Sequence, residues 1–210
     1  MMSIESLLPF VFASAFLSIA PGPDNVFVLM QSAMYGKKSG VFVTLGLCTG
    51  LMVHTTAVAF GVAAIFQSSL VAFTVLKILG ALYLAYLAVQ AFRASASEFD
   101  MPSSNFRTIG ALYRRGIIMN ITNPKVTIFF LAFLPQFASP DQGALSPQIF
   151  FLGGVFISVS LIIFSAIAIA AGSLGGWIQS SPKTQVYLNR IAGTVFAALA
   201  LKLATATNNA

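Results

Sequence analysis

Two residues of opposite charge, Asp24 and Lys125, each lie near the middle of a long apolar segment. Asp24 follows a Pro-Gly-Pro sequence at 21–23, and Lys125 follows an Asn-Pro pair at 123–124. A charged side chain at the centre of a membrane helix costs about 2.5–3.5 kcal/mol on insertion scales, and such residues usually face a protein interior or a wet cavity. The pair therefore indicates a buried site for a small ligand that carries both charges.

An amino-acid zwitterion is such a ligand. Its carboxylate requires a cation or free N–H groups, and its ammonium requires a carboxylate or carbonyl oxygens. Proline interrupts a regular helix, and a helix that restarts after a break presents unpaired N–H groups with partial positive charge. We therefore expect both breaks to bind substrate. The candidate substrate-binding residues are Pro21, Gly22, Pro23, Asp24, Asn25, Asn120, Asn123, Pro124 and Lys125.

Asp24 is also the first candidate for proton coupling. We hypothesise that Asp24 and Lys125 form an ion pair when the site is empty, and that a zwitterion competes by offering each its partner. His54 is a second candidate, as a proton relay; the alternative is a histidine that only forms a hydrogen bond within the bundle. The simpler alternatives for the two breaks are proline kinks and a static structural ion pair.

The composition is that of an integral membrane protein. Of the 210 residues, 58% are hydrophobic and 8% are charged, against about 25% charged in soluble domains. The basic residues lie between apolar runs, so the net charge of +6 does not indicate a nucleic-acid partner. Cys48 is the single cysteine, which excludes an internal disulfide and a dithiol electron carrier. No metal cluster, phosphate-binding loop or nucleophile motif is present, so we expect neither an enzyme nor a cofactor.

We expect an all-α membrane protein with one transmembrane domain over residues 1–210. Six apolar segments are predicted as transmembrane helices, the first and fourth broken at the proline motifs; they run over about 6–33, 40–66, 70–92, 113–137, 147–172 and 188–206. Basic residues collect in the odd-numbered connections, including the loop at 93–113. Because basic loops stay in the cytoplasm, this loop is predicted to be cytoplasmic and both termini to lie outside the cytoplasm.

An internal similarity divides the six segments into two halves. The sequence Lys-Ile-Leu-Gly at 77–80 corresponds to Arg-Ile-Ala-Gly at 190–193, and a Ser-Ser pair precedes each, at 68–69 and 180–181. Gly46 and Gly50 permit a close helix contact, with packing favoured over dimerisation. Because each half has an odd number of helices, three, the two halves have opposite orientations in the membrane and are inverted repeats. This arrangement is typical of secondary transporters with discontinuous helices.

Several motifs resemble the LysE/RhtB family of bacterial lysine and homoserine/threonine exporters. They are Pro-Gly-Pro-Asp-Asn at 21–25, Gly-Lys-Lys-Ser-Gly at 36–40, Asn-Pro-Lys at 123–125 and the aromatic run at 129–137. The resemblance covers nearly the whole chain, although Asp24 stands where many members have Asn. It implies secondary active export of amino acids from the cytoplasm by proton antiport, in the bacterial inner membrane.

Two other functions remain open at this point. The first is export of another small solute or a cation on the same scaffold, although the membrane segments offer no further acidic residues for a divalent cation. The second is a membrane subunit without transport activity, which would tolerate substitution of Asp24 and Lys125. The partners expected are a small amino acid, protons and the lipid bilayer, and assembly into a homo-oligomer is compatible with the sequence.

Overall fold

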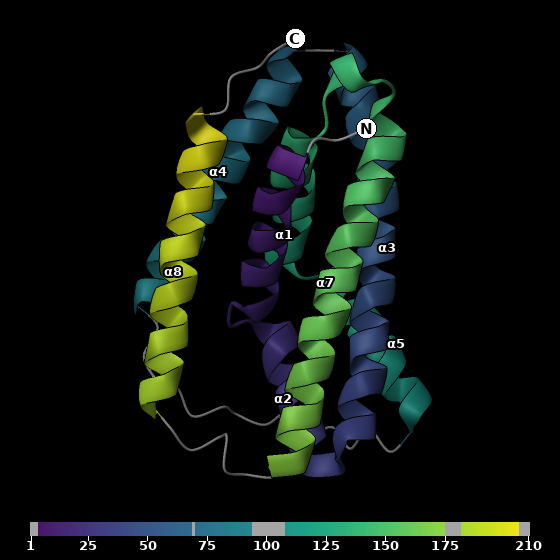
Figure 1. The fold of residues 1–210 in the computed structure, drawn as a ribbon, viewed down its shortest axis with the longest axis vertical. Coiled ribbons are helices and arrows are strands. Elements are labelled where there is room, and N and C mark those ends of the chain that lie inside the picture. Colours follow the sequence, from purple (N-terminus) through teal and green to yellow (C-terminus); the bar gives the residue numbers. More distant parts are fainter. Residues whose placement is uncertain (1–3, 69, 94–107, 175–181, 206–210) are drawn as a thin grey trace.

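The computed structural model describes residues 4–68, 70–93, 108–174 and 182–205, and all regular structure within them is helical (Figure 1). The long elements are α1 (Ile4–Ile19), α2 (Pro23–Tyr35), α3 (Lys37–Ser68), α4 (Leu70–Arg93), α5 (Ile109–Ile121), α7 (Leu145–Leu174) and α8 (Pro182–Thr205). Between α5 and α7 lie α6 (Pro124–Ile128), η1 (Phe129–Phe133), η2 (Leu134–Phe137) and η3 (Pro140–Gln142). These helices coincide with the six predicted segments, although α5 and α8 begin earlier than predicted.

Both predicted breaks are confirmed. The axes of α1 and α2 are bent by 58° across the Pro-Gly-Pro sequence, and those of α5 and the 124–137 segment by 50° across the Asn-Pro pair. Each helix restarts with proline in its first turn, where the missing N–H has no helical partner in any case. The break between α1 and α2 lies near the middle of the bundle's long axis (Figure 1).

Two helices, α3 and α7, are long and apolar enough by themselves to cross a membrane, and each bent pair would add one further span. The protein is therefore a multi-pass membrane protein. Six spans and an inverted repeat remain predictions. Residues 94–107, most of the predicted cytoplasmic loop, lie outside the described residues, as do Ser69 and the second Ser-Ser pair of the repeat.

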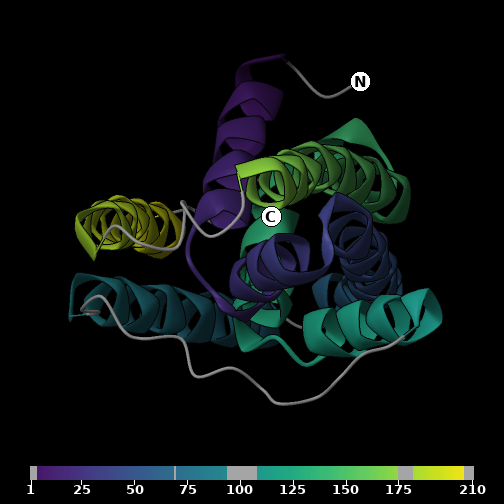
Figure 2. The same cartoon turned by 90° about the horizontal axis from the view of Figure 1, so that it is seen from below.

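The long helices pack in two groups. In one group α3 packs against α5 and α7, and α2 packs against α3 and α7; in the other α4 packs against α8 (Figure 2). Glycines permit the contact of α3 with α5. A Cβ on Gly46 would lie 2.1 Å from the backbone oxygen of Tyr113, and one on Gly116 would lie 2.5 Å from that of Val43. The expected role of the glycines in close packing is confirmed.

Aromatic side chains fill the core beyond the second break. The element η1 is a π-helix, and its Phe129 and Phe130 rings lie 5.3 and 5.0 Å from the ring of Phe156 on α7. On the α4 side, Ala132 packs where Gly80 has no side chain: a Cβ there would lie 2.1 Å from that of Ala132. The segment after Lys125 is therefore anchored on both sides, which holds the break in place.

The N-terminal end of α1 and the C-terminal end of α8 lie at the same end of the bundle (Figure 1). At the other end of the bundle α3 begins with Lys37 and Lys38 (Figure 1). This arrangement places described basic residues at the end opposite to the chain termini. The orientation of that end toward the cytoplasm remains a prediction.

Candidate functional site

The first break leaves the C-terminal carbonyl groups of α1 to be paired by other groups. The last backbone hydrogen bond at the end of α1 runs from the Ala20 N–H to the Phe16 oxygen. The Pro-Gly-Pro sequence that follows cannot extend the helix. The side-chain amide of Asn25 reaches back and donates to the carbonyl oxygens of Ser18, at 2.6 Å, and Ile19, at 3.4 Å. Asn25 therefore caps α1 from the first turn of the next helix.

Lys125, from the second break, pairs the remaining oxygens at this end of α1. Its ammonium donates to the carbonyl oxygens of Leu17, at 3.3 Å, and Ala20, at 3.0 Å, and the side chain is 7% exposed. A cation at the C-terminal end of a helix interacts favourably with the helix dipole. Gly22 leaves room for it, because a Cβ at this position would lie 3.0 Å from Lys125 Nζ.

The second break is shaped by its own cap. Asn123 is buried, and its side-chain oxygen accepts a hydrogen bond of 3.0 Å from the backbone N–H of Lys125. Pro124 occupies the first position of α6. An Asn cap followed by proline is a strong helix start, and here it turns the chain so that the Lys125 side chain reaches α1.

Asp24 lies in the first turn of α2 and is 2% exposed. Its Oδ2 accepts a hydrogen bond of 3.2 Å from the side-chain amide of Asn120, and its Oδ1 has no hydrogen-bond partner among the described residues. The hypothesis of a direct ion pair with Lys125 is therefore wrong for this conformation. Lys125 bonds to the end of α1 instead, where carbonyl oxygens without helical partners lie within reach of its stem.

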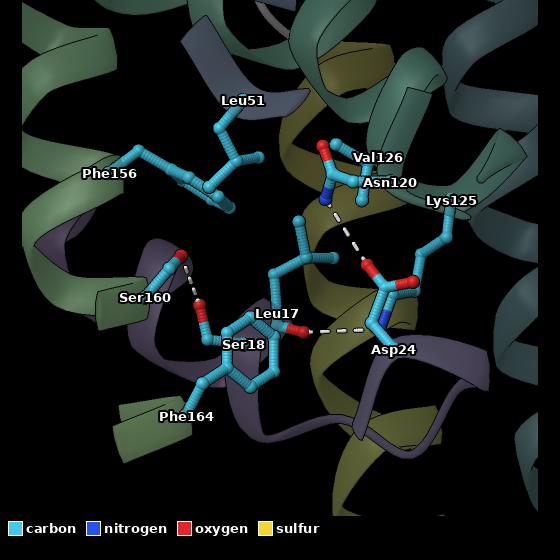
Figure 3. A pocket seen from close by; sticks show the side chains of 10 residues that line it. All are labelled: Leu17, Ser18, Asp24, Leu51, Asn120, Lys125, Val126, Phe156, Ser160 and Phe164. Atoms are coloured by element: carbon cyan, nitrogen blue, oxygen red, sulfur yellow. Dashed lines mark hydrogen bonds between the residues drawn. The ribbon is translucent and has the colours of Figure 1, made fainter. Parts of the chain in front are cut away.

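Asp24 and Lys125 nevertheless line one small cavity, drawn in Figure 3. Its walls come from both broken helices and from α3 and α7; the lining residues are Leu17, Ser18, Asp24, Leu51, Asn120, Lys125, Val126, Phe156, Ser160 and Phe164. The hydroxyls of Ser18 and Ser160 lie 2.9 Å apart and join α1 to α7. The cavity has room for about one water molecule in this conformation.

Several buried polar atoms around the two breaks have no hydrogen-bond partner among the described residues. They are Asp24 Oδ1, Asn25 Oδ1, Asn120 Oδ1 and Asn123 Nδ2. A buried polar group without a partner costs about 1–3 kcal/mol, so such a cluster is unusual in a purely structural core. Three of the four atoms are acceptors, which suits a ligand with N–H donors.

His54 on α3 lies one residue away from Asp24 in the hydrogen-bond network. Its Nε2 lies 3.1 Å from the backbone oxygen of Asn120, whose side-chain amide holds Asp24. His54 is buried beside the ring of Phe130 and is not among the residues that line the cavity. A proton relay and a purely structural hydrogen bond are both compatible with this position.

The other predicted site residues shape the site without lining the cavity. Pro21, Gly22, Pro23 and Pro124 form the breaks, and the side chains of Pro23 and Pro124 are exposed. Sequence reasoning missed Ser18, Ser160 and the two phenylalanines of the cavity wall. The serines offered little signal, because hydroxyls such as that of Ser32 bond to their own helix elsewhere in the bundle.

Buried charged residues between two broken membrane segments are typical of membrane transport proteins. The LysE type translocator model matches residues 15–207, and the chain belongs to this family. The family is one of exporters of small solutes, and membership makes this chain a translocator with a small-molecule substrate.

Relatives match over almost the whole chain. A homoserine/homoserine lactone efflux protein of Salmonella typhimurium is 33% identical over 205 residues, 98% of each chain. An uncharacterised membrane protein of Vibrio cholerae is 31% identical over 98% of this chain and 99% of its own, and one of Bacillus subtilis is 28% identical over 95% and 98%. No solved structure matches this chain.

Proposed function

We propose that this protein exports small amino acids from the cytoplasm by secondary active transport in exchange for protons, with the substrate bound between the two breaks. The observation that carries the proposal is the burial of one carboxylate and one ammonium, Asp24 and Lys125, on the wall of a single cavity. A zwitterion offers a partner to each, and a neutral or singly charged solute offers a partner to one at most.

Each end of the substrate has a complementary group. Its ammonium would bind the free Oδ1 atom of Asp24, which is buried at this cavity. Its carboxylate would bind the ammonium of Lys125. The rest of the cavity wall, which includes Ser18 and Ser160, would contact the substrate's side chain.

Homoserine is the first substrate to test, because relatives over nearly the full length are named for efflux of homoserine and its lactone. The two compounds share an ammonium group, and the lactone joins the carboxyl and hydroxyl groups of homoserine in a ring. A site that holds the ammonium firmly would serve both. The Ser18 and Ser160 hydroxyls would complement the hydroxyl of homoserine.

Asp24 gives a physical basis for proton exchange. A carboxylate that holds a proton no longer attracts an ammonium, so Asp24 would bind either a proton or the substrate, as antiport requires. His54, which bonds to the backbone oxygen of Asn120, is the second candidate for a proton relay. One charge moved across 100 mV is worth about 2.3 kcal/mol, enough to drive a useful concentration ratio.

The small size of the cavity implies that transport needs a second conformation. Space for about one water molecule does not admit an amino acid, so the site must open toward one side at a time. The two breaks are the natural places for this motion, because their backbone is held by side chains such as Asn25 and Asn123 rather than by helical hydrogen bonds. Discontinuous helices form the substrate sites of many secondary transporters.

Uptake into everted membrane vesicles with an imposed proton gradient tests the proposal. We expect uptake of labelled homoserine or a few other small amino acids that collapses with the gradient and falls in Asp24→Asn. Asp141→Asn, at an exposed position in η3, is the matched control and should behave as wild type. Absence of uptake for every amino acid in the panel would favour another small solute or a cation, and full tolerance of Asp24→Asn would favour a role without transport.

A further inference from the structure

We propose that the C-terminal end of α1 is a subsite for a primary ammonium group, and that the side chain of Lys125 is its built-in occupant in this conformation. The Lys125 ammonium donates to the carbonyl oxygens of Leu17 and Ala20, at 3.3 and 3.0 Å. These two bonds are those that the ammonium of a small organic ligand would make.

The subsite exists because α1 ends inside the bundle. The last carbonyl groups of a helix have no helical partner and carry a partial negative charge. At this break the oxygens of Leu17 and Ala20 are directed at Lys125, and Asp24 adds a formal negative charge on the same cavity. Its free Oδ1, on a side chain that is 2% exposed, is an acceptor that this conformation leaves unused.

Lys125 is better explained as an occupant than as a fixed part of the wall. It lies in α6, a helix of only five residues. Its position is stabilised by the end of a different helix, reached with a flexible four-carbon stem. Gly22 leaves the space beside Lys125 Nζ free of a side chain of its own.

Competition for the subsite follows, and this step rests on the proposed function. The ammonium of an incoming amino acid would take the oxygens of Leu17 and Ala20 and the free oxygen of Asp24. The displaced Lys125 would turn to the substrate's carboxylate. When the substrate leaves, Lys125 returns, so that the negative end of α1 never stays uncompensated in the membrane.

The subsite can be tested without a transport assay. The side chain of Lys125 is shortened, and an added amine of the size of the missing part should restore stability. Lys125→Met keeps a stem of nearly full length and removes the ammonium, and Lys125→Ala removes three carbons and the nitrogen. We would measure the midpoint of thermal unfolding of the purified full chain in detergent, at constant ionic strength kept with choline chloride. Ammonium chloride should stabilise Lys125→Met, and n-propylammonium chloride should stabilise Lys125→Ala.

Each rescue should saturate, because a ligand that binds only the folded state raises stability with the logarithm of its concentration above its dissociation constant. Wild type and Lys38→Ala, which lacks an exposed lysine, should show no shift. Tetramethylammonium, with the same charge and no N–H donor, should have no effect on any variant. Adding Asp24→Asn to Lys125→Met should weaken the rescue by ammonium.

Insensitivity of Lys125→Met to ammonium would overturn the inference, and so would equal stabilisation by tetramethylammonium. Lys125→Met decides alone if Lys125→Ala does not purify, because its stem preserves most of the packing. Failure of rescue together with active amino-acid transport would refute only the subsite. Rescue without transport of any amino acid would refute only the proposed function.

Discussion

The Nζ atom of Lys125 lies 3.0 Å from the carbonyl oxygen of Ala20, 105 positions earlier in the chain. This bond joins the two breaks: a residue that starts one helix completes the end of another. Asp24, the first charged residue after Ala20, stays free at one oxygen on the same cavity. The two charges are therefore held close to each other without neutralising each other by direct contact.

Asp24→Asn should retain the fold and lose affinity. Asn has nearly the same shape and its side-chain oxygen can still accept from Asn120. The charge-assisted bond to the substrate's ammonium would be lost, worth about 1.5–3 kcal/mol, or about 10-fold to 100-fold in affinity. The measurement is the concentration dependence of homoserine uptake at several pH values, where the variant should also lose the pH dependence of wild type. Unchanged affinity and pH dependence would remove Asp24 from the mechanism.

Asn120→Ala should impair transport more than His54→Gln. Asn120 holds Asp24 directly and lines the cavity, whereas His54 acts on Asp24 only through the backbone oxygen of Asn120. Initial uptake rates of the two variants, normalised to the amount of folded protein, provide the comparison. If His54→Gln abolished the response to a proton gradient while equilibrium binding of homoserine stayed normal, His54 would be the relay itself.

Gly46→Ala should destabilise the bundle, and Gly61→Ala on the same helix should not. A Cβ on Gly46 would lie 2.1 Å from a backbone oxygen of α5, which cannot move aside as a side chain can, and overpacking of this kind costs about 1–3 kcal/mol. A Cβ on Gly61 meets nothing within 4 Å, and Ala is the better helix former by about 1 kcal/mol. Thermal unfolding in detergent distinguishes them; equal midpoints would show that α3 and α5 do not pack this closely.

Cysteine labelling can test the predicted orientation. Cys48 is buried at 5% exposure, so a membrane-impermeant maleimide should not reach it. On this background Lys38→Cys should react only from the cytoplasmic side and Asp141→Cys only from the outside, because both positions are exposed at opposite ends of the predicted topology. Labelling from the reverse sides would invert the predicted orientation, and labelling of both from one side would refute the number of spans between them.

Much of the fold was predictable because it depends on local chemistry. Proline and asparagine determine where α2 and α6 start, and apolar length determines α3 and α7. The partner of Lys125 was not predictable, since it depends on where the end of α1 lies relative to α6. A charge of opposite sign was the obvious partner, but carbonyl oxygens at a helix end compete with it when they lie closer to the ammonium.

The residues of the cavity wall were also hard to predict from the sequence, because they too depend on how distant segments pack. Ser160 and Phe156 sit on α7, a helix whose sequence is apolar almost throughout, and only packing decides which of its faces meets the site. The π-helical geometry of η1 likewise could not be predicted, because this element contains no proline or glycine. Such features arise from contacts between segments far apart in the chain.

Counterflow of labelled homoserine by purified protein in proteoliposomes tests the central claim most directly, because it needs translocation and a binding site but no driving force. For wild type and for Asp141→Asn we expect counterflow above that of empty liposomes. In Asp24→Asn and in Lys125→Met we expect counterflow to be strongly reduced. Counterflow that persists at the wild-type rate in both site variants would contradict a substrate site at Asp24 and Lys125. Its absence for every amino acid tested, with folded protein, would contradict amino-acid export.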